Sequence, residues 1–154
     1  TGAFGNSPLG NLTPLRGLHL ELLNCNYTEV ADLSPLRGMM LRYLYCPHTK
    51  VADLAPLDGM PLKYLQVYET LVSDLSPLRG MSLTQLWCHD TKIQDLSPLK
   101  DTLLKDLRCD FDPKRDTEIL RSIKTLEKIN GTPVAEFWKQ VEAGNKPSPT
   151  ANMK

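Results

Sequence analysis

Four cysteines and three histidines are the residues of this chain with the greatest capacity for chemistry. Thiolates and imidazoles bind zinc, and a thiolate beside a histidine can act as a nucleophile. Only two pairs are close in sequence, Cys46 with His48 and Cys88 with His89. Paired C-x₂₋₄-C clusters are absent, and adjacent residues of a strand point to opposite faces, so Cys88 and His89 cannot share an ion. We therefore predict no metal site and no cofactor.

The cysteines recur because they belong to a repeat of 21 residues. The segment LRYLYCPHTKVADLAPLDGM from Leu41 to Met60 returns nearly unchanged as LKYLQVYETLVSDLSPLRGM from Leu62. A fixed period of roughly 20 to 50 residues indicates stacked units, each too small to bury its own apolar side. Five copies keep the same register. The sequence therefore predicts a solenoid, and it disfavours an enzyme with an enclosed pocket.

The first half of each copy predicts a short strand with one apolar face. A leucine stands two residues before each cysteine, as Leu44 does before Cys46, so both side chains point into the core. Val67 takes one of the cysteine positions, which indicates that the position requires a small apolar side chain. Strand geometry also disfavours disulfide bonds between parallel neighbours. We expect buried, reduced and inert thiols, which favours a cytoplasmic location.

The second half of each copy predicts a single tight turn, because 21 residues leave no room for a full helix. Ser34 and Pro35 fit the N-cap and first residue of such a turn, and Gly38 fits its C-terminal end. The aspartates at 32, 53, 74 and 95 are expected to cap the backbone, since one carboxylate per layer cannot assemble a calcium site. The threonines at 28, 49, 70 and 91 are expected to hydrogen-bond backbone groups of neighbouring turns.

The repeat resembles a known family. The stretch LxxLxCxxTxV is similar to the conserved leucine-rich repeat segment LxxLxLxxNxL, and DLSPL resembles the helical turn of bacterial internalin-like repeats. The resemblance covers residues 12 to about 116. It implies an α/β solenoid, a right-handed coil with a short parallel β-sheet on the concave face. The convex side would be 3₁₀-like or irregular, and an α-helical cap would close the C-terminal end.

Four segments follow from the pattern. Residues 1–11 form a degraded N-terminal repeat or a truncated end, in which the repeat positions are held by Phe4, Ser7, Leu9 and Asn11. Residues 12–112 hold the five repeats, 113–143 a helical cap, and 144–154 a disordered tail. Because so little chain precedes Leu12, we expect a longer protein upstream. The resemblance implies that a larger catalytic domain, such as a protein kinase, can stand there.

The C-terminal cap is predicted from helical periodicity. Apolar residues recur at three- and four-residue intervals from Ile119 to Ile129, which predicts one amphipathic helix that ends at Asn130-Gly131. A second short helix is predicted to begin at Pro133. A solenoid needs such a cover over its last apolar layer. An amphipathic partner-binding helix is the less favoured interpretation.

The positions that alternate with the core positions are predicted to face outward on the concave sheet. Of ten aromatic residues, seven fall there: Tyr27, Tyr43, Tyr45, Tyr64, Tyr68, Trp87 and Phe111. Tyrosine, tryptophan and arginine dominate binding hot spots. The candidate partner-binding residues are therefore Tyr27, Tyr43, Tyr45, His48, Tyr64, Tyr68, Trp87, His89 and Arg108. The alternative is that aromatic residues are simply favoured on a flat β surface, where neighbouring rings stack.

These observations predict a non-catalytic module, a scaffold that binds a protein or peptide. The net charge is zero, with 18 basic and 18 acidic residues, which does not suggest a nucleic-acid partner. No apolar run approaches the roughly 18 residues of a membrane span, so no membrane partner is expected. No Ser/His/Asp order, paired carboxylates or Gly-rich phosphate loop supports catalysis. Binding of a glycan or small ligand on the same face is the alternative.

Overall fold

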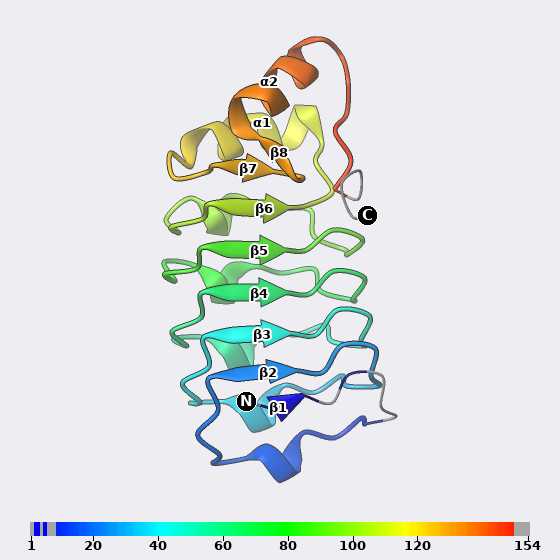
Figure 1. Ribbon diagram of the computed structural model, residues 1–154, viewed down its shortest axis with the longest axis vertical. Coiled ribbons are helices and arrows are strands. Elements are labelled where there is room, and N and C mark those ends of the chain that lie inside the picture. The colour runs from blue at the N-terminus through cyan, green and yellow to red at the C-terminus, as the bar shows by residue number, and fades with distance from the viewer. Residues whose placement is uncertain (1, 4, 6–8, 150–154) are drawn as a thin grey trace.

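The computed structural model describes residues 2–3, 5 and 9–149 and shows a stack of similar coils (Figure 1). Each coil contributes one short strand to a single sheet, and the strands follow one another in sequence order. The described strands are β1 (Gly2–Ala3), β2 (Leu22–Asn24), β3 (Tyr43–Tyr45), β4 (Tyr64–Gln66), β5 (Gln85–Trp87), β6 (Asp106–Arg108), β7 (Lys128–Ile129) and β8 (Thr132–Pro133). All neighbours pair in parallel except β7 and β8, which are antiparallel.

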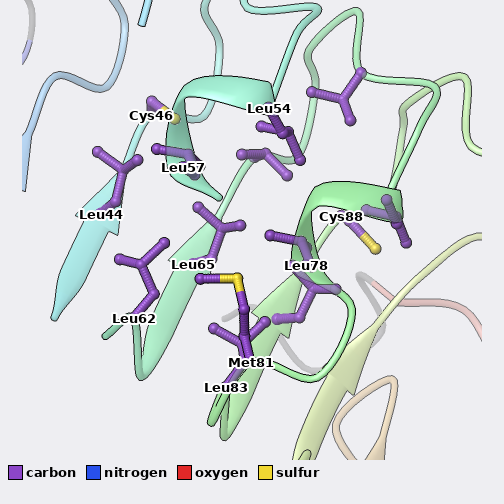
Figure 2. Packing of buried hydrophobic residues seen from close by; sticks show 14 of the residues in the cluster. Leu44, Cys46, Leu54, Leu57, Leu62, Leu65, Leu78, Met81, Leu83 and Cys88 are labelled. Carbon is purple, nitrogen blue, oxygen red and sulfur yellow. The ribbon is translucent and has the colours of Figure 1, made fainter. Parts of the chain in front are cut away.

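The register of the sheet repeats the period of the sequence. Leu44 pairs with Leu65, and Leu65 pairs with Leu86, so that side chains of the same kind stack in columns. These leucines are fully buried, and Figure 2 shows strand leucines facing Leu57 and Leu78 of the turns behind the sheet. The predicted core and the predicted parallel sheet are both confirmed. The face of the sheet that points away from this core is the concave face.

The cysteine positions form one of the buried columns. All four thiols are unpaired and buried, as predicted, and Val67 lies in the same column with no exposed surface. Burial raises the pKa values of Cys88 and Cys109 well above that of an ordinary thiol. These thiols are therefore protonated at neutral pH and are poor nucleophiles.

The convex side consists of short 3₁₀ turns, as expected. They are η1 (Thr13–Leu15), η2 (Ser34–Leu36), η3 (Ala55–Leu57), η4 (Ser76–Leu78) and η5 (Ser97–Leu99). Each turn begins one residue earlier than predicted, because Ser34 is its first helical residue and not its N-cap. The capping group is the aspartate two residues before: Asp32 accepts hydrogen bonds from the backbone N–H and the hydroxyl of Ser34, both at 2.8 Å. The predicted capping role of the aspartates is confirmed.

The threonine column differs from its prediction. The Oγ1 of Thr49 donates to the carbonyl oxygen of Cys46 at 2.7 Å, and Thr28 donates to Cys25 at 2.6 Å in the same way. The bonds stay within one repeat, so the prediction of bonds to neighbouring turns was wrong. The chain turns sharply after each strand, which brings the carbonyl three residues back within reach of the hydroxyl. The threonines thus fix the turn inside each coil, while backbone bonds join the coils.

Three of the capping aspartates predict acid sensitivity. Hydrogen bonds from the backbone N–H and hydroxyl of Ser34 hold the pKa of Asp32 below its usual value, and serines two residues on do the same for Asp74 and Asp95. Because the folded-state pKa values are depressed, the stabilisation is present above the unfolded value of about 3.9 and is lost as pH falls through the folded values. We expect the free energy of unfolding, measured in urea, to fall as pH is lowered below about 4.

A triple variant provides the control. Asp32→Asn, Asp74→Asn and Asp95→Asn each keep one oxygen that can accept from the backbone N–H, as Oδ1 does in Asp32, but they cannot titrate. The triple variant should lose less stability than the natural chain between pH 5 and pH 2. An equal loss in both proteins would show that the acid sensitivity lies elsewhere.

The C-terminal end carries the predicted cap, built from α1 (Pro113–Ser122) and α2 (Val134–Glu142). The prediction of one helix up to Asn130-Gly131 was wrong, because α1 ends at Ser122 and residues 128–129 form β7. Asp112 caps α1 by accepting from the backbone N–H of Lys114 at 2.8 Å. The apolar residues beyond Ser122 are buried by a turn and a strand instead of a helix, which closes the core while extending the sheet.

Asn130 ends the ladder of hydrogen bonds that joins the coils. In each earlier repeat the backbone N–H at the cysteine position donates to a carbonyl of the next strand, as Cys88 N does to Arg108 O at 2.8 Å. Cys109 N has no such carbonyl and donates at 2.9 Å to Oδ1 of Asn130, which is buried. Asn130 has φ 52°, a left-handed conformation that asparagine tolerates better than most residues. The side-chain amide of Asn130 therefore replaces the backbone acceptor that Cys109 lacks.

At the other end, Leu9 and Asn11 make the bonds typical of their repeat positions. Leu9 O accepts from Glu29 N at 3.1 Å, and Asn11 Oδ1 accepts from Thr13 N at 2.8 Å. Phe4 and Ser7, which the sequence also assigns to a degraded repeat, lie outside the described residues. No helix in the described part of the chain is long and apolar enough to cross a membrane.

Candidate functional site

A continuous line of aromatic rings runs along the carboxyl ends of the strands. Tyr27 stacks on His48 with ring centroids 4.1 Å apart, and His48 meets Tyr68 edge-on at 5.4 Å. Tyr68 then stacks on His89 at 4.7 Å and lies 6.4 Å from Trp87. We call these five residues the ring strip. The repeat brings them together, because successive coils place rings from nearby positions one above another.

Arg108 ends the ring strip on the side of the cap. Its guanidinium carbon lies 4.3 Å from the centroid of the Trp87 ring, which is the geometry of a cation–π contact. Burial raises the pKa of Tyr68, and nearby Tyr27 and Glu69 raise it further, whereas Arg108 lowers it. Burial also lowers the pKa of His89, so its imidazole is neutral at pH 7. The strip is therefore an aromatic surface with a positive charge at one end.

The polar atoms near Arg108 are incompletely satisfied. Among the residues that the structure describes, four buried side-chain polar atoms have no hydrogen-bond partner: Trp87 Nε1, His89 Nδ1, Asp106 Oδ1 and Arg108 Nε. All four belong to β5, β6 or the turn after β5. Buried polar groups are normally paired, since an unpaired one costs about 1–3 kcal/mol. Because these atoms are buried, a binding partner can pair them only if side chains at this end of the strip move.

The remaining predicted tyrosines lie beside the strip on the same face. Tyr43 and Tyr64 pair across β3 and β4, with ring centroids 5.1 Å apart. Tyr45 is partly buried next to them, and this burial, together with Tyr43 and Tyr64, raises its pKa. The structure thus places the predicted site residues on one face, where the rings contact one another, but His89 is buried there and not exposed as predicted. Whether they bind a partner stays a prediction.

The left-handed turns after β2 to β5 and a side-chain contact of His48 both come from one repeat position. Tyr27, His48, Glu69 and Asp90 occupy the same repeat position, and each has a φ of 52° or 53°. Because all four share this left-handed turn whatever their side chain, the turn belongs to the fold. His48 Nδ1 also lies 2.8 Å from Glu69 Oε2, which orients the imidazole between Tyr27 and Tyr68.

Phe111 is not on the concave surface, where the sequence places it. Its side chain is buried, with its ring centroid 5.0 Å from that of Phe137 and 6.0 Å from that of Trp138. The chain leaves the repeat at this point to enter α1, so the residue turns into the cap. The prediction for Phe111 was wrong because the cap replaces the left-handed turn of the earlier repeats.

Sequence patterns did not predict that the chain after α2 contacts residues of the candidate site. Figure 1 shows it returning from α2 to the carboxyl end of β6. The carbonyl oxygen of Pro147 accepts from Asn130 Nδ2 at 3.0 Å, and that of Pro149 accepts from Arg108 Nη1 at 3.0 Å. We call residues 146–149 the proline segment. Residues 144–149 belong to the predicted disordered tail, whereas 150–154 lie outside the described residues.

Comparison with known proteins finds similarity in structure. No protein-family model and no curated protein matches the sequence. An internalin (inlF) from Listeria monocytogenes superposes with a TM-score of 0.69 at 25% identity, over 81% of this chain and 38% of the internalin. An internalin C2 (inlC2) from the same species gives 0.65 at 18% identity, over 99% of this chain and 76% of that one. This chain thus spans well under half of the first protein. The predicted leucine-rich repeat fold is confirmed.

Proposed function

Because this chain is a leucine-rich repeat solenoid of the short, internalin-like type, we propose that it is a non-catalytic module that binds a protein or peptide. The binding surface is the concave face, centred on the ring strip together with Tyr43, Tyr45, Tyr64 and Arg108. The observation that supports this best is the chain of ring contacts from Tyr27 to Trp87. The fold needs the buried columns, but it does not need these rings.

The physical character of the face supports binding of a polypeptide. Tyr45, Tyr64 and Trp87 are only partly buried, so they offer rigid apolar area without being part of the core. Rings that already contact one another lose little conformational entropy when a partner covers them. Arg108, whose guanidinium lies against the Trp87 ring, adds a charged group that can give the specificity that apolar contact lacks.

A selection from a random peptide library tests the assignment. Peptides selected on the intact chain should bind the Tyr64→Ala, Trp87→Ala double variant at least about tenfold more weakly, because loss of two hot-spot rings costs more than about 1.4 kcal/mol. The matched control is the Met40→Ala, Leu71→Ala variant, which removes two exposed apolar side chains that are not part of the concave site. Dissociation constants from fluorescence anisotropy provide the readout.

The outcome distinguishes the concave face from the rest of the surface. Circular dichroism and thermal melting establish that both variants are folded before binding is compared. If the selected peptides bind the natural chain and the double variant equally, the concave face is not the binding surface. Glycan binding is the second candidate, since the exposed tyrosine and tryptophan rings can stack on sugars. A glycan array probed with the same proteins, showing hits that the double variant loses, would favour it.

A further inference from the structure

We propose that the ring strip takes an extended, proline-containing peptide, and that the proline segment occupies one end of this surface within the chain itself. The inference rests on the proposed function and names the class of partner. The peptide's carbonyl oxygens accept hydrogen bonds from side chains of successive repeats, and its proline rings pack against the aromatic rings.

The first support is the way in which the proline segment is held. Pro147 and Pro149 are two residues apart, and their carbonyl oxygens are bound by Asn130 and Arg108, which belong to neighbouring coils. Proline has no backbone N–H, so a chain with proline at these positions leaves no donor unpaired. Side chains that donate a hydrogen bond to the carbonyl oxygen of every second residue are therefore suited to proline at those positions.

Proline also lowers the entropic cost of binding. It restricts φ to about −65° and favours the extended polyproline II conformation before contact is made. Aromatic grooves in other proteins bind such segments for this reason. The segment KPSP holds two prolines in four residues, and Arg108, which donates to Pro149, lies against the Trp87 ring.

The second support is the direction in which the segment runs. From Pro147 to Pro149 the contacts move from Asn130, just after β7, to Arg108 on β6. A peptide that continues in this direction next meets Trp87 on β5, whose Nε1 has no partner, and then Tyr68. The partly exposed ring of Trp87 thus lies at the next step, and its buried indole donor becomes available when the side chains that cover it move. The line of aromatic rings therefore continues from Trp87 to Tyr68, beyond the point where the proline segment ends.

The third support is the loose seating of the proline segment. A hollow of about 240 Å³ lies among Asp110, Phe111 and residues 146–149, so the segment is not packed tightly against the cap. Its contacts include two side-chain hydrogen bonds to its carbonyl oxygens. The net contribution of such hydrogen bonds is small, because water satisfies the same groups when the segment leaves. A peptide in solution can therefore compete with the chain's own segment.

The test is a titration of the intact ¹⁵N-labelled chain with the peptide GNKPSPTANMK, which has the sequence of residues 144–154. The control peptide GNKASATANMK differs only in its two prolines. We expect the Trp87 indole N–H and Arg108 Nε–H resonances to shift on addition of the first peptide. The control peptide should bind at least about fivefold more weakly. A Trp138→Phe variant identifies which indole signal belongs to Trp87.

Two variants of the intact chain sharpen the test. Arg108→Met removes the donors but keeps an unbranched apolar side chain, and it should weaken peptide binding at least about fivefold. Arg79→Met makes the same change at an exposed residue after η4, on the convex side, and should leave binding unchanged. Pro147→Ala with Pro149→Ala should strengthen binding of the peptide about twofold or more, because the chain's own segment then competes less.

The proposal is overturned if several millimolar peptide leaves both resonances in place, or if the two peptides bind equally. It is also overturned if Arg108→Met has no more effect than Arg79→Met. Its failure can be separated from failure of the proposed function. Library peptides without proline that need Tyr64 and Trp87 would leave the concave face as a binding surface and exclude only this class of partner.

Discussion

Replacing Phe111 by alanine is expected to lower the free energy of unfolding by about 3–5 kcal/mol, the usual cost of removing a buried phenylalanine ring. The ring is 1% exposed and packs against Phe137 and Trp138, which join α2 to the last repeat. Its loss leaves a cavity between the repeats and the cap. Urea unfolding followed by circular dichroism measures the effect, and Phe111→Leu, which keeps most of the apolar volume, should cost less than about half as much.

Tyr27→Ala is the matched control, because Tyr27 holds the same repeat position as Phe111. Its side chain is 52% exposed and contacts His48. Loss of one stacked aromatic pair at the surface should cost no more than about 1 kcal/mol. Equal costs for Tyr27→Ala and Phe111→Ala would contradict the assignment of Phe111 to the cap core.

Replacing Asn130 by alanine is expected to cost about 2–5 kcal/mol. The buried N–H of Cys109 loses its acceptor, which costs about 1–3 kcal/mol. Alanine must also adopt the positive φ of 52°, which costs roughly 1–2 kcal/mol. Thermal unfolding gives the total, and hydrogen exchange at the Cys109 amide shows where the ladder opens.

Asn130→Gly separates the two contributions. Glycine adopts the left-handed conformation without penalty but supplies no acceptor, so it should recover only the backbone part of the loss. The Cys109 amide should exchange fast in both variants. If the glycine variant is as stable as the natural chain, the amide of Asn130 does not close the ladder.

The repeated part of the fold could be predicted because each residue type meets a structural requirement that is the same in every coil. Leucine and cysteine at alternate strand positions must face inward, and the aspartate before each serine must cap a turn. Five copies in register made these assignments mutually consistent. Two local predictions were wrong, the first residue of each 3₁₀ turn and the partners of the threonine hydroxyls. The threonine hydroxyls bond within their own coil, because sequence periodicity does not say which of two nearby carbonyls is closer.

The cap could be predicted only in part because it is where the repetition stops. Ile123, Leu126 and Ile129 have spacing that suits a helix, yet they also suit a turn followed by a strand that covers the last layer. These residues form a strand because Lys128–Ile129 pairs with β6. That pairing depends on tertiary structure, which the local pattern does not show. The prediction that Phe111 faces outward was wrong for the same reason. The cytoplasmic location and the division into four segments stay predictions.

The candidate site was predicted as a set of residues on one face, but its connections were not. The sequence placed Tyr68, Trp87 and Arg108 together because they alternate with core positions. It could not show that Arg108 binds the carbonyl of Pro149, since 41 residues separate them and no pattern links them. Nor could it show that His89 is buried with an unpaired nitrogen, which depends on the rings around it.

The buried cysteines can report the order in which the coils unfold. Val67 divides the four thiols into two neighbouring pairs, Cys25 with Cys46 and Cys88 with Cys109. Each thiol is buried, so a labelling reagent reaches it only when its coil opens. In stacked repeats, opening can begin at one place and spread to the next coil. The order in which the two pairs are labelled therefore reports from which end the stack unravels.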